Sequence, residues 1–256
     1  MKKVTVLGAT GSVGRTTVNL LKDNNESFNV QALTAGSNWK LLAEQACLLR
    51  PKFVAIANSD CYQPLKDALQ GRNIDVGAGD DAIVEAAARP SDWVMAGIVG
   101  VAGLPATVAA VRRGAIIAFA NKECLVSAGN ILLAEARASN AQLIPVDSEH
   151  NAIFQVFESQ NKDWIDKIIL TASGGPFRMS STSDMALKTP EAALAHPNWK
   201  MGKKISIDSA TMMNKGLEII EAHFLFAMPE DKIDVIVHPQ SIIHSLVAYK
   251  DGSFLA

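Results

Sequence analysis

The first half of the chain alternates short apolar runs with longer amphipathic segments. This alternation is typical of βαβ units, in which buried parallel strands are joined by helices that cross one face of a sheet. We therefore predict an α/β fold that begins with a Rossmann-like, doubly wound parallel sheet. The expected strands are residues 4–7, 28–33, 53–57, 94–98, 116–120 and 142–146, and the expected helices are residues 40–49, 80–88, 105–113 and 131–139.

One apolar stretch, residues 93–111, carries no charged side chain and approaches the length of a membrane span. Gly97, Gly100, Gly103 and Pro105 interrupt it. A buried strand, a glycine turn and a packed helix explain the same residues, so we expect no membrane-spanning segment.

After Pro145 the pattern changes and predicts a second, α+β domain. Residues 173–204 are polar and show little periodicity, which for a segment of this length favours a functional lid. We place the domains at residues 1–146 and 147–256. The other expected elements of the second domain are helices at residues 150–158 and 216–226 and strands at residues 165–172, 205–208, 233–237 and 242–249.

The chain ends in a hairpin-type turn from Lys250 to Ser253, and the strand after this turn stops at Ala256. A strand this short pairs poorly with its neighbour. The sequence therefore predicts that the second domain is truncated at its C-terminal end.

Charge and cysteine content narrow the class of protein. The 256 residues include 24 basic and 26 acidic side chains spread along the sequence, for a formal net charge of −2. That balance argues against a nucleic-acid or membrane-surface partner. The three cysteines show no CxxC spacing, which fits a reducing compartment, and strand-like residues begin at Val4, which leaves no room for a signal peptide. We expect a cytoplasmic protein.

A glycine-rich motif, Gly-Ala-Thr-Gly-Ser-Val-Gly at residues 8–14, follows the first expected strand and opens a helix. Glycines allow a tight turn and a close approach of the backbone to a pyrophosphate, whose charge the helix N-terminus favours. We therefore predict dinucleotide binding through Thr10, Gly11, Ser12 and Val13. The alternative is a structural turn that binds no ligand.

The end of the second strand indicates which dinucleotide binds. Enzymes that use NAD place an acidic residue there to accept the ribose 2′-hydroxyl. Residues 34–38 contain no carboxylate, so we predict NADPH, with contacts from Gly36, Ser37 and Asn38 and support from nearby Lys40. Alternatively, Ser37 and Asn38 only cap the helix that follows.

Two carboxylates, Asp147 and Glu149, lie two residues apart at the end of the last strand of the first domain, where ligands bind in open α/β sheets. In an extended chain both point to the same side and can face one hard cation such as Mg²⁺. The alternative is a solvated loop pair, or a helix N-cap with Glu149 in the first turn.

A polar strand-to-helix junction is expected before the helix at residues 216–226. Ser209, Asn214 and Lys215 place a hydroxyl, an amide and an ammonium around its N-terminus, which suits a phosphate monoester. Glu218 follows about one turn into the helix. The alternative is that Glu218 and Glu221 lie on an ordinary exposed helix face.

Several motifs occur in a specific order along the chain. They are residues 8–14, Ala-Asn-Lys-Glu at 120–123, Pro-Val-Asp-Ser-Glu-His-Asn at 145–151, Thr-Ala-Ser-Gly-Gly-Pro-Phe at 171–177, and residues 196–202, 209–218 and 238–241. Together they resemble the deoxyxylulose phosphate reductoisomerase family along the whole chain.

That resemblance implies a reaction and its cofactors. Members isomerise and reduce 1-deoxy-D-xylulose 5-phosphate to 2-C-methyl-D-erythritol 4-phosphate, in non-mevalonate isoprenoid biosynthesis, with NADPH and Mg²⁺, Mn²⁺ or Co²⁺. A homodimer is also implied. The family often carries a lysine where this chain has Ser37, and it continues into a helical C-terminal domain, in line with the expected truncation.

The resemblance also implies roles for individual residues. The metal ligands would be Asp147, Glu149 and Glu218, which together with Lys122 are the expected catalytic residues. The phosphate ligands would be Ser173, Ser209, Asn214 and Lys215. Lys122, Ser148, Glu149, His196 and Glu218 would contact the rest of the substrate, Asn121 and Glu123 the cofactor, and Trp199 and Met201 would belong to the lid.

Two other functions fit parts of the sequence. Semialdehyde and acyl-phosphate dehydrogenases open with a similar glycine-rich loop but act through a cysteine thioester, for which Cys124 is the candidate. The other possibility is a catalytically inactive fragment that binds NADP. Insensitivity to thiol alkylation would separate the reductoisomerase from the cysteine-dependent dehydrogenase. Metal-dependent NADPH oxidation on addition of the sugar phosphate would separate it from the inactive fragment.

Overall fold

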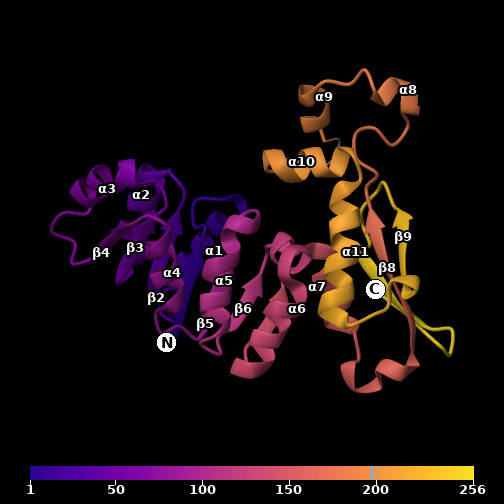
Figure 1. The fold of residues 1–256 in the computed structure, drawn as a ribbon, viewed down its shortest axis with the longest axis horizontal. Coiled ribbons are helices and arrows are strands. Elements are labelled where there is room, and N and C mark those ends of the chain that lie inside the picture. Colours follow the sequence, from indigo (N-terminus) through magenta and orange to yellow (C-terminus); the bar gives the residue numbers. More distant parts are fainter. Residues whose placement is uncertain (197–198, 200) are drawn as a thin grey trace. The chain divides into compact units, whose positions relative to one another are not determined.

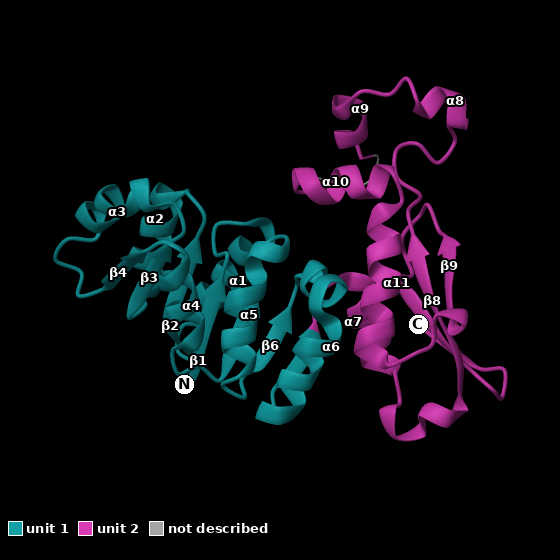
Figure 2. Cartoon of the chain, viewed as in Figure 1, with its two compact units in different colours: residues 1–144 teal, residues 145–256 magenta. Residues whose placement is uncertain are grey.

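A computed structural model describes residues 1–196, 199 and 201–256. Pro197, Asn198 and Lys200, which belong to the expected lid, lie outside the described residues. The chain forms two compact units, residues 1–144 and 145–256 (Figure 2). Each unit is described separately.

A seven-stranded sheet forms the centre of the first unit (Figure 1). The strand order is β4-β3-β2-β1-β5-β6-β7; β1 to β6 pair in parallel, with β7 at one edge beside β6. This arrangement confirms the predicted doubly wound sheet. The strands are β1 (Lys2–Leu7), β2 (Phe28–Ala35), β3 (Phe53–Ile56), β4 (Asp75–Ala78), β5 (Trp93–Ala96), β6 (Ile116–Phe119) and β7 (Gln142–Pro145).

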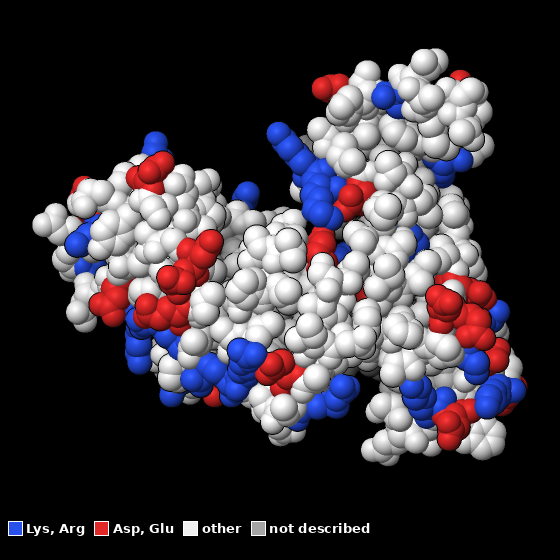
Figure 3. Space-filling view, in the orientation of Figure 1, with Lys and Arg blue, Asp and Glu red and all other residues white. Residues whose placement is uncertain are grey.

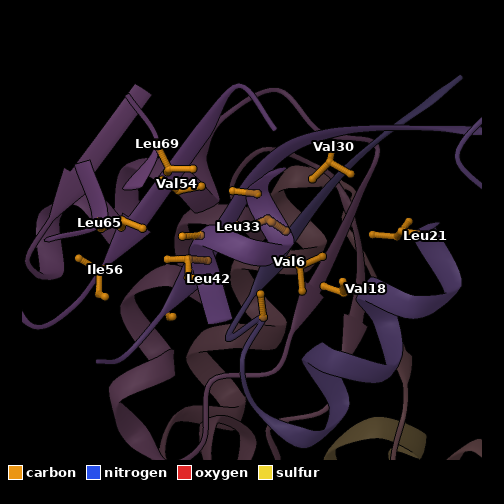
Figure 4. Packing of buried hydrophobic residues seen from close by; sticks show 14 of the residues in the cluster. Val6, Val18, Leu21, Val30, Leu33, Leu42, Val54, Ile56, Leu65 and Leu69 are labelled. Atoms are coloured by element: carbon orange, nitrogen blue, oxygen red, sulfur yellow. The ribbon is translucent and has the colours of Figure 1, made fainter. Parts of the chain in front are cut away.

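Six α-helices flank this sheet in the described part of the chain. They are α1 (Ser12–Asp23), α2 (Trp39–Leu49), α3 (Tyr62–Ala68), α4 (Asp80–Ala88), α5 (Leu104–Val111) and α6 (Lys122–Ser139). Apolar residues of α1, α2 and α3 pack with those of β1, β2 and β3 in one cluster (Figure 4). Leu33 and Leu42 are fully buried in it, and each such side chain stabilises the fold by about 1.5–3 kcal/mol.

The strand order reverses between β1 and β5, which lie side by side. In open α/β sheets, ligands bind beyond the carboxyl ends of the strands at such a switch point. Gly8 follows β1 and Gly97 follows β5, and the Gly97 amide donates to the carbonyl oxygen of Leu7 at 3.0 Å. The predicted glycine-rich motif therefore lies at the switch point.

A mixed sheet with the order β11-β10-β8-β9 forms the second unit together with its helices. β8 pairs in parallel with β9 and antiparallel with β10, which gives the predicted α+β character. Ile153 of α7 and Ala222 and Phe226 of α11 pack on its core. The strands are β8 (Ile165–Ala172), β9 (Ile233–Val237), β10 (Ser245–Tyr249) and β11 (Phe254–Leu255), and the helices are α7 (Ser148–Val156), α8 (Thr182–Met185), α9 (Pro190–Leu194), α10 (Lys203–Ala210) and α11 (Met213–Phe226).

The strand predicted at residues 205–208 is wrong, because these residues belong to helix α10. Alternating apolar residues suggested a strand, but Ser206 and Ala210 are buried at the i, i+4 spacing of a helix. Ser206 Oγ also donates to the carbonyl oxygen of Gly202 at 3.0 Å. Contacts of α10 with α9 and α11 outweigh the local β pattern.

Other predicted boundaries moved as well. The helix predicted at residues 131–139 is α6, which begins nine residues earlier, at Lys122. The last long strand begins at Ser245 instead of residue 242, and α11 begins at Met213 instead of residue 216. The segment at residues 173–204 contains two short helices, α8 and α9, and each begins with a side-chain cap, from Ser181 and Thr189.

The uncharged stretch at residues 93–111 forms β5, a 3-10 turn and α5, as predicted. None of the helices in the described part of the chain is long and apolar enough to cross a membrane. On the face drawn in Figure 3, Lys and Arg side chains lie interspersed with Asp and Glu side chains, as expected from the balanced composition.

Candidate functional site

The glycine-rich loop has the geometry of an anion-binding turn. Gly8 adopts a φ of 80°, and its amide donates to Thr34 Oγ1 at 2.9 Å. A Cβ at Gly14 would lie 2.1 Å from the carbonyl oxygen of Gly8, so only glycine lets α1 pack directly on the loop. The N-cap residue of α1, Gly11, brings no side chain, and its amide donates to the carbonyl oxygen of Gly8 at 3.0 Å. Exposed Ser12 begins the first turn, whose N–H groups have no partner within the helix.

The end of β2 carries the residues predicted to select NADPH. Gly36, Ser37 and Asn38 are all exposed there. Asn38 Oδ1 accepts the amide of Leu41 at 3.2 Å, so Asn38 caps α2 as the alternative interpretation proposed. The cap uses the side-chain oxygen and leaves the amide nitrogen as a donor for a ligand.

The residues after β6 are more buried than a ligand-binding loop usually is. Asn121 is only 2% exposed, and its amide nitrogen donates to the carbonyl oxygens of Ile98 and Gly100. Its Oδ1 accepts the amide of Cys124 at 3.2 Å and caps α6. Asn121 thus ties the loop after β5 to α6. Lys122, 7% exposed, and Glu123 follow in the first turn of α6.

The second unit brings together the three predicted carboxylates. Asp147, Glu149 and Glu218 each offer an oxygen, and these atoms lie within 4.8 Å of one another. The prediction that Asp147 and Glu149 lie in extended chain is wrong. Asp147 is the N-cap residue of α7, with ψ 133° and no capping bond from its side chain, and Glu149 lies in the first helical turn.

Donors of α7 and α11 orient the carboxylates. Lys215 Nζ donates to Glu149 Oε1 at 3.1 Å and to Glu218 Oε2. Asn214 Nδ2 donates to Glu218 Oε1, and Ser148 Oγ donates to Glu149 Oε2 at 2.6 Å. Charged partners make such bonds stronger than neutral ones. Two predicted phosphate ligands, Asn214 and Lys215, therefore also contact predicted metal ligands.

Glu218 and Glu221 are fully buried, so the alternative that they lie on an ordinary exposed helix face is wrong. Glu221 Oε2 lies 3.3 Å from Nδ1 of His150, and His150 is itself buried. His150 Nε2 lies 3.0 Å from the carbonyl oxygen of Glu218 and must donate to it. His150 therefore links α7 to α11 directly behind the carboxylates.

These carboxylates line a cavity of about 380 Å³ within the second unit. Eight of the residues predicted to contact the substrate line it, whereas Lys122 belongs to the first unit. Those eight are Ser148, Glu149, Ser173, His196, Ser209, Asn214, Lys215 and Glu218. Trp199 and Met201, which were expected in the lid, line the same cavity.

Ser173 and His196 form a hydrogen-bonded pair in the cavity wall. His196 Nδ1 accepts the amide of Trp199 at 3.1 Å, so in the neutral ring the proton lies on Nε2. Nε2 is 3.0 Å from Ser173 Oγ, which also accepts the amide of Gly175 at 3.2 Å. Partial burial lowers the pKa of His196 below its ordinary value and favours the neutral ring.

Ser173 and Ser209, which the resemblance implies as phosphate ligands, come from two segments that contact each other. Gly175 adopts a φ of 66°, and a Cβ there would lie 2.5 Å from the carbonyl oxygen of Ser209. Glycine therefore lets the loop after β8 contact the end of α10. Ser173 and Ser209 both line the cavity.

Sequence reasoning missed three polar residues of the cavity, Thr171, Ser241 and His244. Ser241 belongs to the His-Pro-Gln-Ser motif, which was recognised without a role. No local pattern distinguished His244 from an ordinary strand residue, because it was placed inside the predicted strand at residues 242–249.

Comparisons with known proteins agree with the order of the motifs. The 1-deoxy-D-xylulose 5-phosphate reductoisomerase profile matches residues 4–129, and the profile of the C-terminal domain of the same enzyme matches residues 143–226. The chain belongs to the 1-deoxy-D-xylulose 5-phosphate reductoisomerase family.

Individual reductoisomerases match the chain over its whole length. The protein of Rhodospirillum centenum is 59% identical over 256 residues, which are 100% of this chain and 64% of that relative. The protein of Zymomonas mobilis is 55% identical over 255 residues, covering 100% of this chain and 66% of the relative. The chain thus spans about 64% to 66% of the length of these relatives.

Solved reductoisomerase structures share the fold. The enzyme from Zymomonas mobilis in complex with NADPH superposes with a TM-score of 0.94 at 54% identity, covering 100% of this chain and 66% of that one. A second crystal structure, in complex with NADPH, fosmidomycin and magnesium, gives 0.95 at 41% identity with the same coverage.

Proposed function

We propose that this chain carries the cofactor-binding and catalytic parts of an enzyme that converts 1-deoxy-D-xylulose 5-phosphate to 2-C-methyl-D-erythritol 4-phosphate with NADPH and a divalent cation. One observation supports this most strongly: three carboxylates from α7, its N-cap and α11 share one cavity with hydroxyl, amide and ammonium donors suited to a phosphate. Relatives that bind NADPH and magnesium support it as well.

The first unit would bind NADPH. The loop at Thr10, Gly11, Ser12 and Val13 would hold the pyrophosphate through backbone N–H groups, because it begins a helix at the switch point of the sheet. Exposed Gly36, Ser37 and Asn38 at the end of β2 would receive the 2′-phosphate. Bound NADPH would supply the hydride for the reduction. For Asn121, whose side chain is engaged in capping, we propose a backbone contact.

Asp147, Glu149 and Glu218 would hold the cation. Their oxygens are hard ligands at a spacing that allows one ion to bind all three, which fits Mg²⁺ or Mn²⁺. When bound, the cation would stabilise negative charge that develops on substrate oxygens. The chain's own contribution is to hold the carboxylates in place through Lys215, Asn214 and Ser148.

Ser173, Ser209, Asn214 and Lys215 would bind the phosphate, and Ser148 and His196 the carbon backbone. Neutral His196 carries its proton on Nε2, beside Ser173 Oγ, so it would act as a hydrogen-bond donor, to Ser173 or to a substrate oxygen in its place, and not as a base in this pose. Phosphate contacts lie away from the reacting carbons, and their binding energy would orient the substrate. Lys122 remains a proposed catalytic contact from the first unit.

Cysteine chemistry is disfavoured by the structure of the first unit. Cys124 is fully buried in the first turn of α6. Burial raises the pKa of its thiol to about 12, which removes the thiolate that a thioester mechanism requires. The alternative that remains is an inactive NADP-binding fragment.

A coupled assay tests the proposal and separates it from that alternative. NADPH oxidation should require both 1-deoxy-D-xylulose 5-phosphate and Mg²⁺, stop on addition of a chelator, and fall strongly when NADH replaces NADPH. NADPH binding without oxidation would identify the inactive fragment. A cytoplasmic homodimer is also our proposal, and light scattering on the purified chain tests the dimer.

A further inference from the structure

A short loop, residues 238–244, joins β9 to β10 and supplies Ser241 and His244 to the cavity wall. Both ends of the loop are fixed to β8. The amide of His238 donates to the carbonyl oxygen of Ala172 at 2.7 Å. Thr171 Oγ1 donates to the carbonyl oxygens of Ile243 and His244 at 2.9 and 2.7 Å.

Between these two ends, the ring of His238 forms hydrogen bonds within the loop. Its Nε2 accepts the amides of Ile242 at 3.1 Å and Ile243 at 3.4 Å. Apolar packing contributes little here, because Ile242 is 78% and Ile243 41% exposed. The two hydrogen bonds to the imidazole nitrogen, and not apolar packing, therefore hold this part of the loop in place.

The loop also contains a strained residue. Ser241 adopts a φ of 50°, in the left-handed region that disfavours side chains with a Cβ. The Ser241 amide and hydroxyl both donate to the carbonyl oxygen of His238, at 3.0 and 3.3 Å. Such a conformation persists only where surrounding bonds determine it.

We propose that His238 is a positioning residue for the cavity: its ring, protonated on Nδ1, fixes Ser241 and His244 toward a phosphorylated ligand. The inference rests on the proposed function for the identity of that ligand. His238 does not itself line the cavity, so it acts through the loop. Nε2 accepts two N–H bonds, so it cannot carry a proton in this state.

Two substitutions isolate the role of the acceptor. His238→Phe keeps a planar ring and removes Nε2, whereas His238→Gln retains an acceptor on a side chain of similar reach. Because His238→Phe loses both of the hydrogen bonds that Nε2 accepts, we expect KM for the sugar phosphate to rise about tenfold in this variant. We expect kcat within about twofold, unchanged NADPH binding, and partial recovery in His238→Gln. His223→Phe serves as the matched control, because exposed His223 of α11 also makes a hydrogen bond, to the carbonyl oxygen of Met228 at 2.7 Å, but does not contact the loop.

Hydrogen exchange gives a readout that needs no activity. The amides of Ile242 and Ile243 should exchange faster in His238→Phe than in the unsubstituted chain, and His238→Gln should slow them again. Unchanged exchange, or faster exchange without any change in KM, would overturn the proposal. If the unsubstituted chain does not turn over, the proposed function fails, and exchange alone decides whether His238 fixes the loop.

A spectroscopic test on the unsubstituted chain covers the case in which His238→Phe does not fold. The ¹⁵N spectrum of the histidine rings should show His238 protonated on Nδ1 and unprotonated on Nε2 at neutral pH. A proton on Nε2 is incompatible with the two accepted N–H bonds and would overturn the inference.

Discussion

Lys215 of α11 donates from Nζ to Oε1 of Glu149 in α7 across 3.1 Å, although 66 residues separate the two in the chain. The same ammonium contacts Glu218, and the Lys215 side chain is only 5% exposed. A residue predicted to bind phosphate thus also pairs with two predicted metal ligands and offsets one of their two negative charges. Replacing Lys215 should therefore disturb the two carboxylates even in the absence of substrate.

Replacing Lys215 by Met should destabilise the chain by about 3–5 kcal/mol, because breaking a buried ion pair leaves unpaired carboxylates in place. Mg²⁺ should then raise the thermal midpoint of Lys215→Met more than that of the unsubstituted chain. Lys167→Met is the control: Lys167 and Asp234 pair at 2.6 Å but are 40% and 49% exposed, so we expect a change under about 1 kcal/mol. Equal Mg²⁺ responses in Lys215→Met and the unsubstituted chain would contradict this role.

The same substitution should raise KM for the sugar phosphate and leave NADPH binding intact, since Lys215 belongs to the second unit. Separate titrations of the two ligands distinguish these effects. Weakened NADPH binding would point to a global loss of structure instead.

Glu149→Gln should lower metal affinity and turnover by at least about tenfold, because a neutral amide replaces a charged ligand. Metal titration of activity measures the effect. Glu230→Gln, at an exposed site of the same unit, should leave the titration curve unchanged. If both variants show the same metal dependence as the unsubstituted chain, the carboxylates do not bind the cation.

Acid should destabilise the cavity through His196. Burial lowers its pKa below the ordinary value of 6.5, so the unfolded chain takes up a proton that the folded chain resists. Its contribution to folding stability should therefore fall as pH drops below about 6.5, until the folded ring also becomes protonated. Urea unfolding of the unsubstituted chain and of His196→Gln, measured from pH 7.5 to pH 5, isolates the contribution of His196. Parallel curves of stability against pH for the two chains would refute this prediction.

Gly14→Ala should lose stability by about 1–3 kcal/mol and weaken NADPH binding, because the new Cβ would lie 2.1 Å from the Gly8 carbonyl oxygen. Gly36→Ala provides a control for stability, since a Cβ at Gly36 meets no atom within 4 Å. Denaturant unfolding of both variants measures the difference. A stable Gly14→Ala would show that α1 can move away from the loop.

Cys124 should resist alkylation in the folded chain. Burial raises the pKa of its thiol to about 12, whereas Cys47 and Cys61 are only partly buried. Mass spectrometry after iodoacetamide treatment should find label on Cys47 and Cys61, and on Cys124 only after denaturation. Rapid labelling of native Cys124 would revive a thiol mechanism.

Sequence periodicity predicted the first unit better than the second. Its strands are continuous apolar runs separated by amphipathic helices, and this pattern comes directly from burial on both faces of a parallel sheet. β4 was missed because Asp75 and Gly77 break the apolar run, and its side chains are only partly buried. α3 is short and contains Pro64, so its helical pattern was weak.

The residues of the site could be predicted from the sequence, but the hydrogen bonds between them could not. The residue types of the cavity followed from the motifs and the family resemblance, and the structure brings them together. The hydrogen bonds of Lys215 to Glu149 and of His150 to Glu218 depend on how α7 packs beside α11, over separations of 66 and 68 residues. No local rule encodes such tertiary contacts, for the same reason that the helix at Lys203–Ala210 was read as a strand.

The hydroxyl of Ser173 accepts N–H bonds from Gly175 and from the ring of His196. With its lone pairs directed at those two donors, it has its own hydrogen left to offer. Ser173 therefore acts as a hydrogen-bond donor toward the cavity. It favours a ligand oxygen, which can accept this bond, over a ligand group that can only donate. At this one position of the wall, the orientation of the hydroxyl is thus set before any ligand binds.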